Sequence, residues 1–393
     1  MKKIIIIFIV LLCCIGLNKF SLSTVYAEQN VEEELREEID NQIKNIDLTE
    51  IEAIINSLTD KQSIIFGESS FWNKIQSLLN GDYNTDEESI VKIVSEIFFE
   101  ELVRILPTIA LIIAIAILFG MFSLSQPNFK NHTIKEIIHF VCYSSIIIII
   151  VKSLFSLVGQ ATECINLIKN QMEAIFPILL TLMASLGGNA MVSVYQPAFA
   201  VLTGGIIGLF SKILLPLFIC ILVFSLLSNL TRTVKFDKFA SFFSSMYKWI
   251  IGFVFTVFYG FVAIKGITAG TYDNISIRTA KYTIKNSIPI IGGYISDGIN
   301  LITASSVLIK NAIGMGGILV LFATIIIPLI NMIIYMFCLK LTAAILEPLS
   351  DARIVNFISA VSKTISLLIA LIVAIVFMYI LLVALVLISA NIY

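Results

Sequence analysis

Residues 275–317 read ISIRTAKYTIKNSIPIIGGYISDGINLITASSVLIKNAIGMGG and place polar residues and glycines at helical spacing inside an otherwise apolar chain. The part before Pro289 predicts an amphipathic helix, because its isoleucines recur on one face. Arg278, Lys281 and Lys285 fall together on another face of that helix. The stretch therefore predicts a basic helix face next to a proline break.

A second helix is predicted after Gly292 and Gly293, with an apolar stripe opposite a small, polar side. The stripe consists of Ile295, Ile299, Ile302, Ile309 and Ile313. The polar side consists of Asp297, Asn300, Ala304, Asn311 and Gly314. Such a helix suits neither lipid nor an ordinary water-exposed loop. Within the segment 267–317, the candidates for an assembly surface or a conduit lining are Arg278, Lys281, Lys285, Asp297, Asn300, Lys310, Asn311 and Gly314.

The composition around this stretch is that of an integral membrane protein. Of 393 residues, 58% are hydrophobic and only 13% are charged, and the mean hydropathy is +0.97. These values lie outside the range of soluble globular domains. The net charge of −1 combines an acidic N-terminal quarter with lysine-rich later loops, which argues against nucleic-acid binding.

The first 27 residues predict a secretory signal peptide. Lys2 and Lys3 precede an apolar run that is short for a membrane span, and Val25 and Ala27 form a small-residue cleavage site before Glu28. The alternative is an uncleaved anchor. In either case the following segment is expected outside the cytoplasm.

Residues 28–104 predict an acidic, helical extracytoplasmic region. Apolar residues recur at helical spacing among its glutamates, and Thr49 followed by Glu52 predicts a capping box. A further periodic stretch runs from Glu87 toward the first span. The region is either a solvated hairpin or a docking surface for a basic partner.

The remaining residues, 105–393, predict a polytopic, all-α membrane domain of about seven to eight transmembrane helices. The eight apolar runs are 105–124, 137–158, 174–191, 197–210, 213–230, 250–265, 317–339 and 365–390. The third and fourth are short and glycine-rich, so seven spans with one re-entrant piece is an alternative. Prolines within these runs should kink or end helices locally: Pro107, Pro177, Pro216 and Pro328.

The positive-inside rule conflicts with this order at one place. It assigns the loops around Lys130 and Arg232 to the cytoplasm, which leaves Arg278, Lys281 and Lys285 outside despite their charge. We expect that anionic partners or lipid headgroups hold this basic face, that it lies on the membrane surface without a partner, or that the span count is off by one.

The sequence contains no motif for catalysis or metal binding. A Walker-type phosphate loop and an HExxH motif are both absent, and the two histidines cannot form a zinc site with the cysteines. We therefore predict no enzyme activity, no cofactor and no metal. The four cysteines after the signal are expected to be packing residues, with Cys164 near an aqueous face.

Ionisable residues near the spans are expected to reach the membrane interface rather than a substrate. These residues are Lys152, Glu173, Lys212 and Lys265. Gly204 and Gly208 form a GxxxG pattern that predicts close helix packing within the chain or between copies. Gly314, Gly316 and Gly317 predict tight packing at the start of the seventh span.

The signature stretch closely resembles that of the stage III sporulation protein AE family. The residues that carry the resemblance are Arg278, Thr279, Ala280, Lys281, Pro289, Gly293, Asp297, Lys310, Asn311 and Gly314. The IDLTEIE segment at residues 46–52, the FWNKIQSLLNGDY segment that begins at Phe71 and the overall length also fit the family. The resemblance extends over essentially the whole chain and is looser in the acidic region.

This resemblance implies a subunit of the stage III A assembly of endospore-forming bacteria, in the mother-cell membrane that engulfs the forespore. Its implied partners are the other stage III A proteins, including the AA ATPase, and stage II sporulation protein Q across the intermembrane space. Together these proteins are expected to form a conduit between mother cell and forespore. We expect this chain to be a membrane platform or channel-forming subunit of that conduit, and a candidate homo-oligomer. A small-solute permease with a site around Glu173 is the alternative, and an intramembrane hydrolase is disfavoured because no nucleophile constellation is present.

Overall fold

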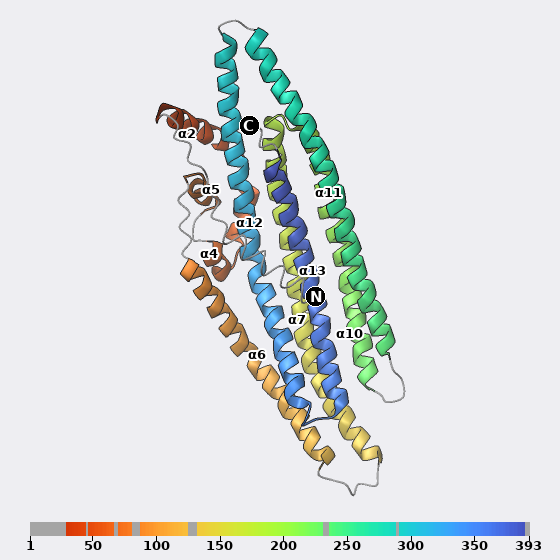
Figure 1. The fold of residues 1–393 in the computed structure, drawn as a ribbon. Coiled ribbons are helices and arrows are strands. Elements are labelled where there is room, and N and C mark those ends of the chain that lie inside the picture. Colours follow the sequence, from red (N-terminus) through yellow and green to blue (C-terminus); the bar gives the residue numbers. More distant parts are fainter. Residues whose placement is uncertain are drawn as a thin grey trace.

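The described part of the computed structural model consists of helices and short connections. It covers residues 29–44, 46–66, 70–80, 87–124, 132–230, 236–287 and 291–389. The predicted signal peptide lies outside these residues. Four short helices come first and six long helical segments follow (Figure 1), in agreement with the predicted all-α membrane fold.

The short helices are α2 (Gln29–Lys44), α3 (Thr49–Asn56), α4 (Asp60–Phe66) and α5 (Phe71–Asn80). The predicted capping box is wrong, because Leu48 is the residue before α3 and no side chain caps it. Asp47 replaces it: its Oδ1 accepts the N–H of Thr49 at 3.0 Å and the Thr49 hydroxyl at 2.5 Å. These hydrogen bonds lower the pKa of Asp47 below its ordinary value.

The long segments run alternately up and down. They are α6 (Glu87–Leu124), α7 (His132–Ser185), a third segment formed by α8 (Asn189–Ala200), η1 (Val201–Ile206), α9 (Ile207–Leu209), η2 (Phe210–Leu214) and α10 (Leu215–Leu230), then α11 (Asp237–Ser287), α12 (Ile291–Leu346) and α13 (Ala352–Ile388). The carboxyl ends of α6, α10 and α12 lie at one end of the molecule (Figure 1), which we call the loop end. The carboxyl end of α11 and the start of α12 lie at the opposite end, the hairpin end.

Six helical segments in the described chain are long and apolar enough to cross a membrane. The expected number of seven to eight is therefore too high for these residues. The runs at 137–158 and 174–191 share the single helix α7, and those at 197–210 and 213–230 share the third segment. At about 1.5 Å per residue, the 54 residues of α7 and the 56 of α12 far exceed the ~20 needed to cross a bilayer.

Local sequence explains where several helices end or continue. Gly187, with φ of 82°, ends α7, and its N–H bonds to Ala184 O while the N–H of Gly188 bonds to Met183 O. Asp351 begins α13 by accepting the N–H of Arg353 at 2.8 Å. Of the two expected effects of the prolines, a kink or an end, the end is wrong at three of them, because α6, α7 and α12 continue past Pro107, Pro177 and Pro328. Pro216 is the second residue of α10, which begins directly after the π-helical segment η2.

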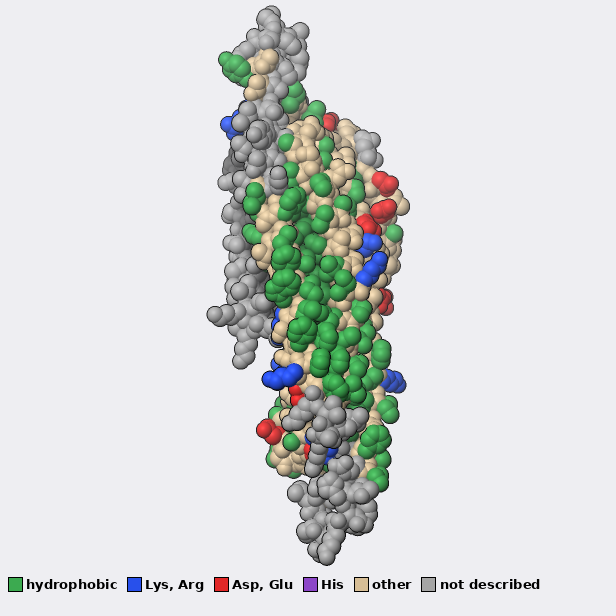
Figure 2. Space-filling model, turned by 90° about the vertical axis from the view of Figure 1, so that its right-hand side faces the viewer, with side chains coloured by type: hydrophobic (Ala, Val, Ile, Leu, Met, Phe, Trp, Pro, Cys, Tyr) green, Lys and Arg blue, Asp and Glu red, His purple; other side chains and the backbone are tan. Residues whose placement is uncertain are grey.

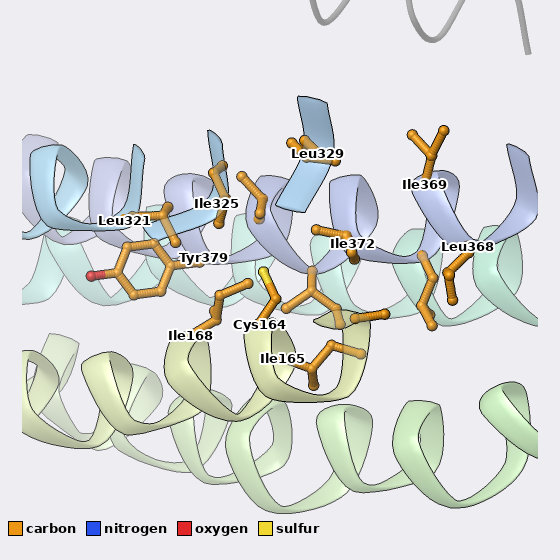
Figure 3. Packing of buried hydrophobic residues seen from close by; sticks show 14 of the residues in the cluster. Cys164, Ile165, Ile168, Leu321, Ile325, Leu329, Leu368, Ile369, Ile372 and Tyr379 are labelled. Carbon is orange, nitrogen blue, oxygen red and sulfur yellow. The ribbon is translucent and has the colours of Figure 1, made fainter. Parts of the chain in front are cut away.

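The centre of the molecule is formed by α12 and α13, against which α7 and the third segment pack. In the third segment, α12 and α13, 50%, 50% and 56% of the most apolar stretch is buried, against 28% in α7, 22% in α6 and 17% in α11. Figure 3 shows Cys164 of α7 among side chains of α12 and α13, including Leu321 and Ile372. Cys164 is only 1% exposed, so the expectation that it lies near an aqueous face is wrong.

The outer helices present an apolar surface. Seen from the side of α10 and α11, hydrophobic side chains gather in a continuous band, while charged ones lie along its edge and near its lower end (Figure 2). Exposed residues of α11 include Phe242, Trp249, Phe253 and Ile264. Such a surface is suited to lipid contact.

Candidate assembly surface

The predicted signature stretch folds into the hairpin of α11 and α12. Helix α11 ends at Ser287 and α12 begins at Ile291, so the break falls at the predicted position next to Pro289. The second helix begins before Gly292 and Gly293 rather than after them. The hairpin extends beyond the end of α13 (Figure 1). Between Ile291 and Lys310, which contacts the end of α13, α12 has a length of about 28 Å.

The basic face of the hairpin is exposed where the structure describes it. Arg278 is exposed, and Tyr282, one turn later on the same face, is 71% exposed. The side chains of Lys281, Lys285 and Asp297 lie outside the described residues. Lys281 and Lys285 follow Arg278 by three and seven positions, which places them on this face of the helix.

The polar residues of α12 divide into an exposed and a buried group. Asn300 and Ala304 are exposed, whereas Ser305, Ser306 and Lys310 are buried. Of the predicted apolar stripe, Ile309 and Ile313 are buried and Ile302 is 48% exposed. The buried polar group exists because other parts of the chain supply its partners.

Helix α2 supplies the partner of the two serines. Gln42 Nε2 donates to Ser305 Oγ at 2.9 Å, and Ser306 Oγ donates to Gln42 Oε1 at 2.8 Å. Ile39 and Ile43 of α2 are buried in the common core. Helices α2, α4 and α5 therefore lie against α12, and α3 contacts α7 and α5, so these helices do not form a separate hairpin in solvent (Figure 1).

The end of α13 supplies the partner of Lys310. The Lys310 side chain is fully buried, and its Nζ donates to Ser389 O at 2.6 Å and to Val386 O and Leu387 O at 3.2 Å. A buried side chain cannot line an aqueous conduit, so the burial of Lys310 contradicts the prediction that this residue is conduit-lining. Asn311 is half-buried, and its Oδ1 has no hydrogen-bond partner among the described residues.

Glycines of α12 lie where other segments approach its backbone most closely. A Cβ at Gly314 would lie 2.5 Å from Leu387 Cδ2, and one at Gly316 would lie 2.9 Å from the ring of Phe71. A Cβ at Gly317 would lie 2.8 Å from Ile175 Cδ1. The predicted tight packing at these glycines is confirmed. Gly314 is thus a packing residue and lies on the buried side of the hairpin.

Gly204 and Gly208 have a different environment. A Cβ at either position would have no neighbour within 4 Å in the described structure. The expectation that they pack against another helix of the same chain is therefore not met. Gly120 of α6, which fits no packing motif, has the closest contact among the described glycines, because a Cβ there would overlap the carbonyl oxygen of Leu349.

Polar pairs connect α7 and α12 along their length. Gln160 lies 3.2 Å from the amide of Asn331, and Gln171 Nε2 donates to Thr324 Oγ1 at 2.5 Å. With the Asn331 amide turned over, its nitrogen instead donates to both oxygens of Glu101 at 3.1 and 3.2 Å, and its oxygen faces Gln160. Glu101 pairs in addition with Arg104. These contacts fix α6, α7 and α12 to one another.

Replacing Thr324 with valine is expected to destabilise the protein more than replacing Gln171 with leucine. Thr324→Val leaves the fully buried Gln171 amide without a partner, at a cost of about 1–3 kcal/mol. Gln171→Leu leaves the Thr324 hydroxyl bonded to Val320 O. In thermal unfolding in detergent, the midpoint of the double variant should be close to that of Gln171→Leu. Equal losses in the two single variants would contradict this pairing.

The predicted alternative site around Glu173 is not formed. Glu173 is 47% exposed and pairs with Lys169, one turn earlier, at 3.5 Å. Lys152 and Lys212 are also exposed, and the side chain of Lys265 lies outside the described residues. The described side chains contain no group of three or more His, Cys, Asp and Glu residues that could hold a metal ion. A small cavity of about 30 Å³ between α7 and α10 is lined by Val151, Phe155, Phe218 and other apolar residues.

A family model described as Stage III sporulation protein AE matches residues 69–390 of this chain. The chain belongs to this family. The stage III sporulation protein AE of Bacillus subtilis (strain 168) is 27% identical over 293 residues, which cover 74% of this chain and 73% of that protein. No solved structure matches the chain.

The region matched by the AE family includes the parts that build the hairpin and its base. It begins just before α5 and runs through Gly120, the α11–α12 hairpin, Lys310 and the last turn of α13. The resemblance predicted from the signature stretch is therefore confirmed. Helices α2 to α4 lie before the matched residues. As a member of the AE family, the chain is a sporulation protein with a polytopic helical membrane fold.

Proposed function

We propose that the chain is a membrane platform or channel-forming subunit of the stage III A and stage II Q conduit between mother cell and forespore. In this proposal it lies in the mother-cell membrane and contributes to late forespore development. The observation that carries the proposal is the projecting α11–α12 hairpin, which carries the exposed Arg278 on α11 and continues through α12 into the buried core of the helix bundle. Membership of a sporulation family supports the same role.

The orientation follows from the positive-inside rule. Lys130, Arg232, Lys235 and Arg353 lie in or beside the three connections of the loop end, which is cytoplasmic in this proposal. The hairpin end, with α2 to α5, then faces the space between the two membranes. The basic residues of α11 stay outside, as in the order predicted from the sequence. An odd number of segments, namely α7, the third segment and α11, separates them from the connection after α6. They lie on a long projecting helix rather than in a short loop.

The implied partners are the other stage III A proteins, with the AA ATPase on the cytoplasmic side and stage II sporulation protein Q across the intermembrane space. A platform has no solute path of its own. The purified chain in sealed vesicles should therefore give no gradient-driven uptake of small solutes, while it copurifies with stage III A proteins from sporulating cells. Robust uptake by the isolated chain would overturn the proposal in favour of a permease.

Reversing the charge of the hairpin face is expected to reduce assembly. The triple variant Arg278→Glu, Lys281→Glu and Lys285→Glu should lower copurification of stage III A partners and sporulation by at least 10-fold, because a complementary acidic surface would then be repelled. The matched control is Arg278→Lys, Lys281→Arg and Lys285→Arg, which keeps the charge and should behave as wild type. Normal assembly of the charge-reversed chain would exclude docking through this face.

A further inference from the structure

Lys310 is the described lysine that lies deepest in the protein, and its surroundings are unusual for a buried ammonium. It is fully buried, and no carboxylate among the described residues forms an ion pair with it. Its three hydrogen bonds all go to backbone carbonyls of the last turn of α13. An ammonium carries three N–H donors, so this set of three carbonyls satisfies it completely.

The carbonyl end of a helix has a specific need that such a group can meet. The last four carbonyls of a helix have no partner within the helix, and the helix dipole places partial negative charge there. Helix α13 ends at Ile388 without the glycine in a left-handed conformation that often closes a helix, and Ser389 is extended with φ of −69° and ψ of 148°. The N–H of Ser389 satisfies Leu385 O, and Lys310 satisfies Val386 O and Leu387 O.

Two further contacts hold the same turn. The hydroxyl of Tyr195 in α8, itself 1% exposed, lies 2.7 Å from Ser389 Oγ. Leu387 packs directly against Gly314 of α12, where a side chain would not fit. Helices α8, α12 and α13 therefore meet at one point, at the base of the projecting hairpin.

We propose that Lys310 is a positioning residue that caps the carboxyl end of α13 from the neighbouring helix α12 and so holds the last turn of α13 at the base of the hairpin. The lysine acts here as a structural cation inside the protein. Loss of the ammonium would leave buried carbonyls without donors, and the last turn would open while the rest of α13 stays packed.

The test measures the opening of that turn with a cysteine reporter. Val386→Cys is introduced into a full-length chain whose native cysteines are replaced by alanine, because Val386 is fully buried and its carbonyl accepts from Lys310. The purified protein in detergent is labelled with a maleimide, and the initial rate is compared between variants at position 310. A second reporter, Leu368→Cys, lies fully buried in the middle of α13 and reports on unfolding of the whole helix.

Lys310→Met is expected to raise the labelling rate at position 386 at least 10-fold and to leave the rate at position 368 within 2-fold of wild type. Lys310→Arg keeps the charge and the donors and should restore a rate close to wild type. The matched control Lys340→Met removes an exposed lysine of the same helix and should change neither rate. If Lys310→Met cannot be purified, Lys310→Gln, which keeps two donors without the charge, should give a rate between wild type and the 10-fold increase.

Two results would overturn the cap. The first is an unchanged rate at position 386 in Lys310→Met or Lys310→Gln. The second is an equal rise at positions 386 and 368 without recovery in Lys310→Arg, because that pattern indicates a general loss of packing. These outcomes do not depend on the proposed role in the conduit, since the assay uses the isolated chain.

Discussion

Replacing Gly120 with alanine is expected to destabilise the protein strongly, although the same change inside a helix usually stabilises it by about 0.5–1 kcal/mol. The reason is steric. The new Cβ would overlap the carbonyl oxygen of Leu349, a backbone atom in the turn between α12 and α13 that cannot rotate away. Forced overpacking of this kind costs about 1–3 kcal/mol or more. Thermal unfolding of the purified protein in detergent should therefore give a clearly lower midpoint than wild type.

Gly204→Ala provides the matched control for Gly120→Ala. Both glycines lie in helical segments of the membrane domain, but a Cβ at Gly204 has no neighbour within 4 Å in the described structure. Gly204→Ala should leave the unfolding midpoint unchanged or raise it slightly. A Gly120→Ala protein as stable as Gly204→Ala would show that α6 does not approach the turn after α12 as closely as the structure places it.

Replacing Phe71 with alanine is expected to detach α5 and its neighbouring helices from α12. Phe71 is fully buried, and its ring lies so close to α12 that a Cβ at position 316 would be only 2.9 Å from it. Truncation of a buried phenylalanine costs about 3–5 kcal/mol. Limited proteolysis should then cleave residues 29–80 much faster than in wild type, while α7, α12 and α13 remain intact.

Ile64→Ala serves as the control for Phe71→Ala because it also removes a large apolar side chain from the N-terminal helices, at a position that is 46% exposed. Its cleavage rate should stay close to wild type. If Phe71→Ala protein resists cleavage equally well, the polar contacts of Gln42 and Gln62 with α12 hold these helices without the aromatic anchor.

The amino-acid pattern predicted the helical fold well but not how the apolar runs combine into helices. Residues 159–173 contain Gln160, Glu163, Lys169 and Gln171, and this polarity suggested a break between two spans. In the structure α7 continues through them, because Gln160 and Gln171 have partners on α12 that are 171 and 153 residues away. The local amino-acid sequence does not indicate such distant partners.

The same limit explains the outcomes at the candidate site residues. Lys310 and Asn300 are both polar residues of one helix, yet one caps a buried helix end and the other is exposed. Gly204 and Gly208 fit a packing pattern, yet among the described residues nothing lies within 4 Å of a Cβ placed there, whereas Gly120 fits no pattern and has the closest neighbour of the described glycines. Spacing along one helix predicts which residues share a face, but the segment that covers this face comes from another part of the chain.

The distance along the chain between contacting segments has a consequence for biosynthesis. Gln42 bonds to Ser305, Gln62 to Thr324 O and Ser350 to Ala116 O, separations of 263, 262 and 234 residues. At about 5–20 residues per second, helices α2 to α6 leave the ribosome roughly 10–50 s before α12 exists to receive them. During that interval their apolar faces depend on the insertion machinery or on lipid. A chain whose synthesis ends before residue 300 therefore lacks the part of α12 against which its first helices pack.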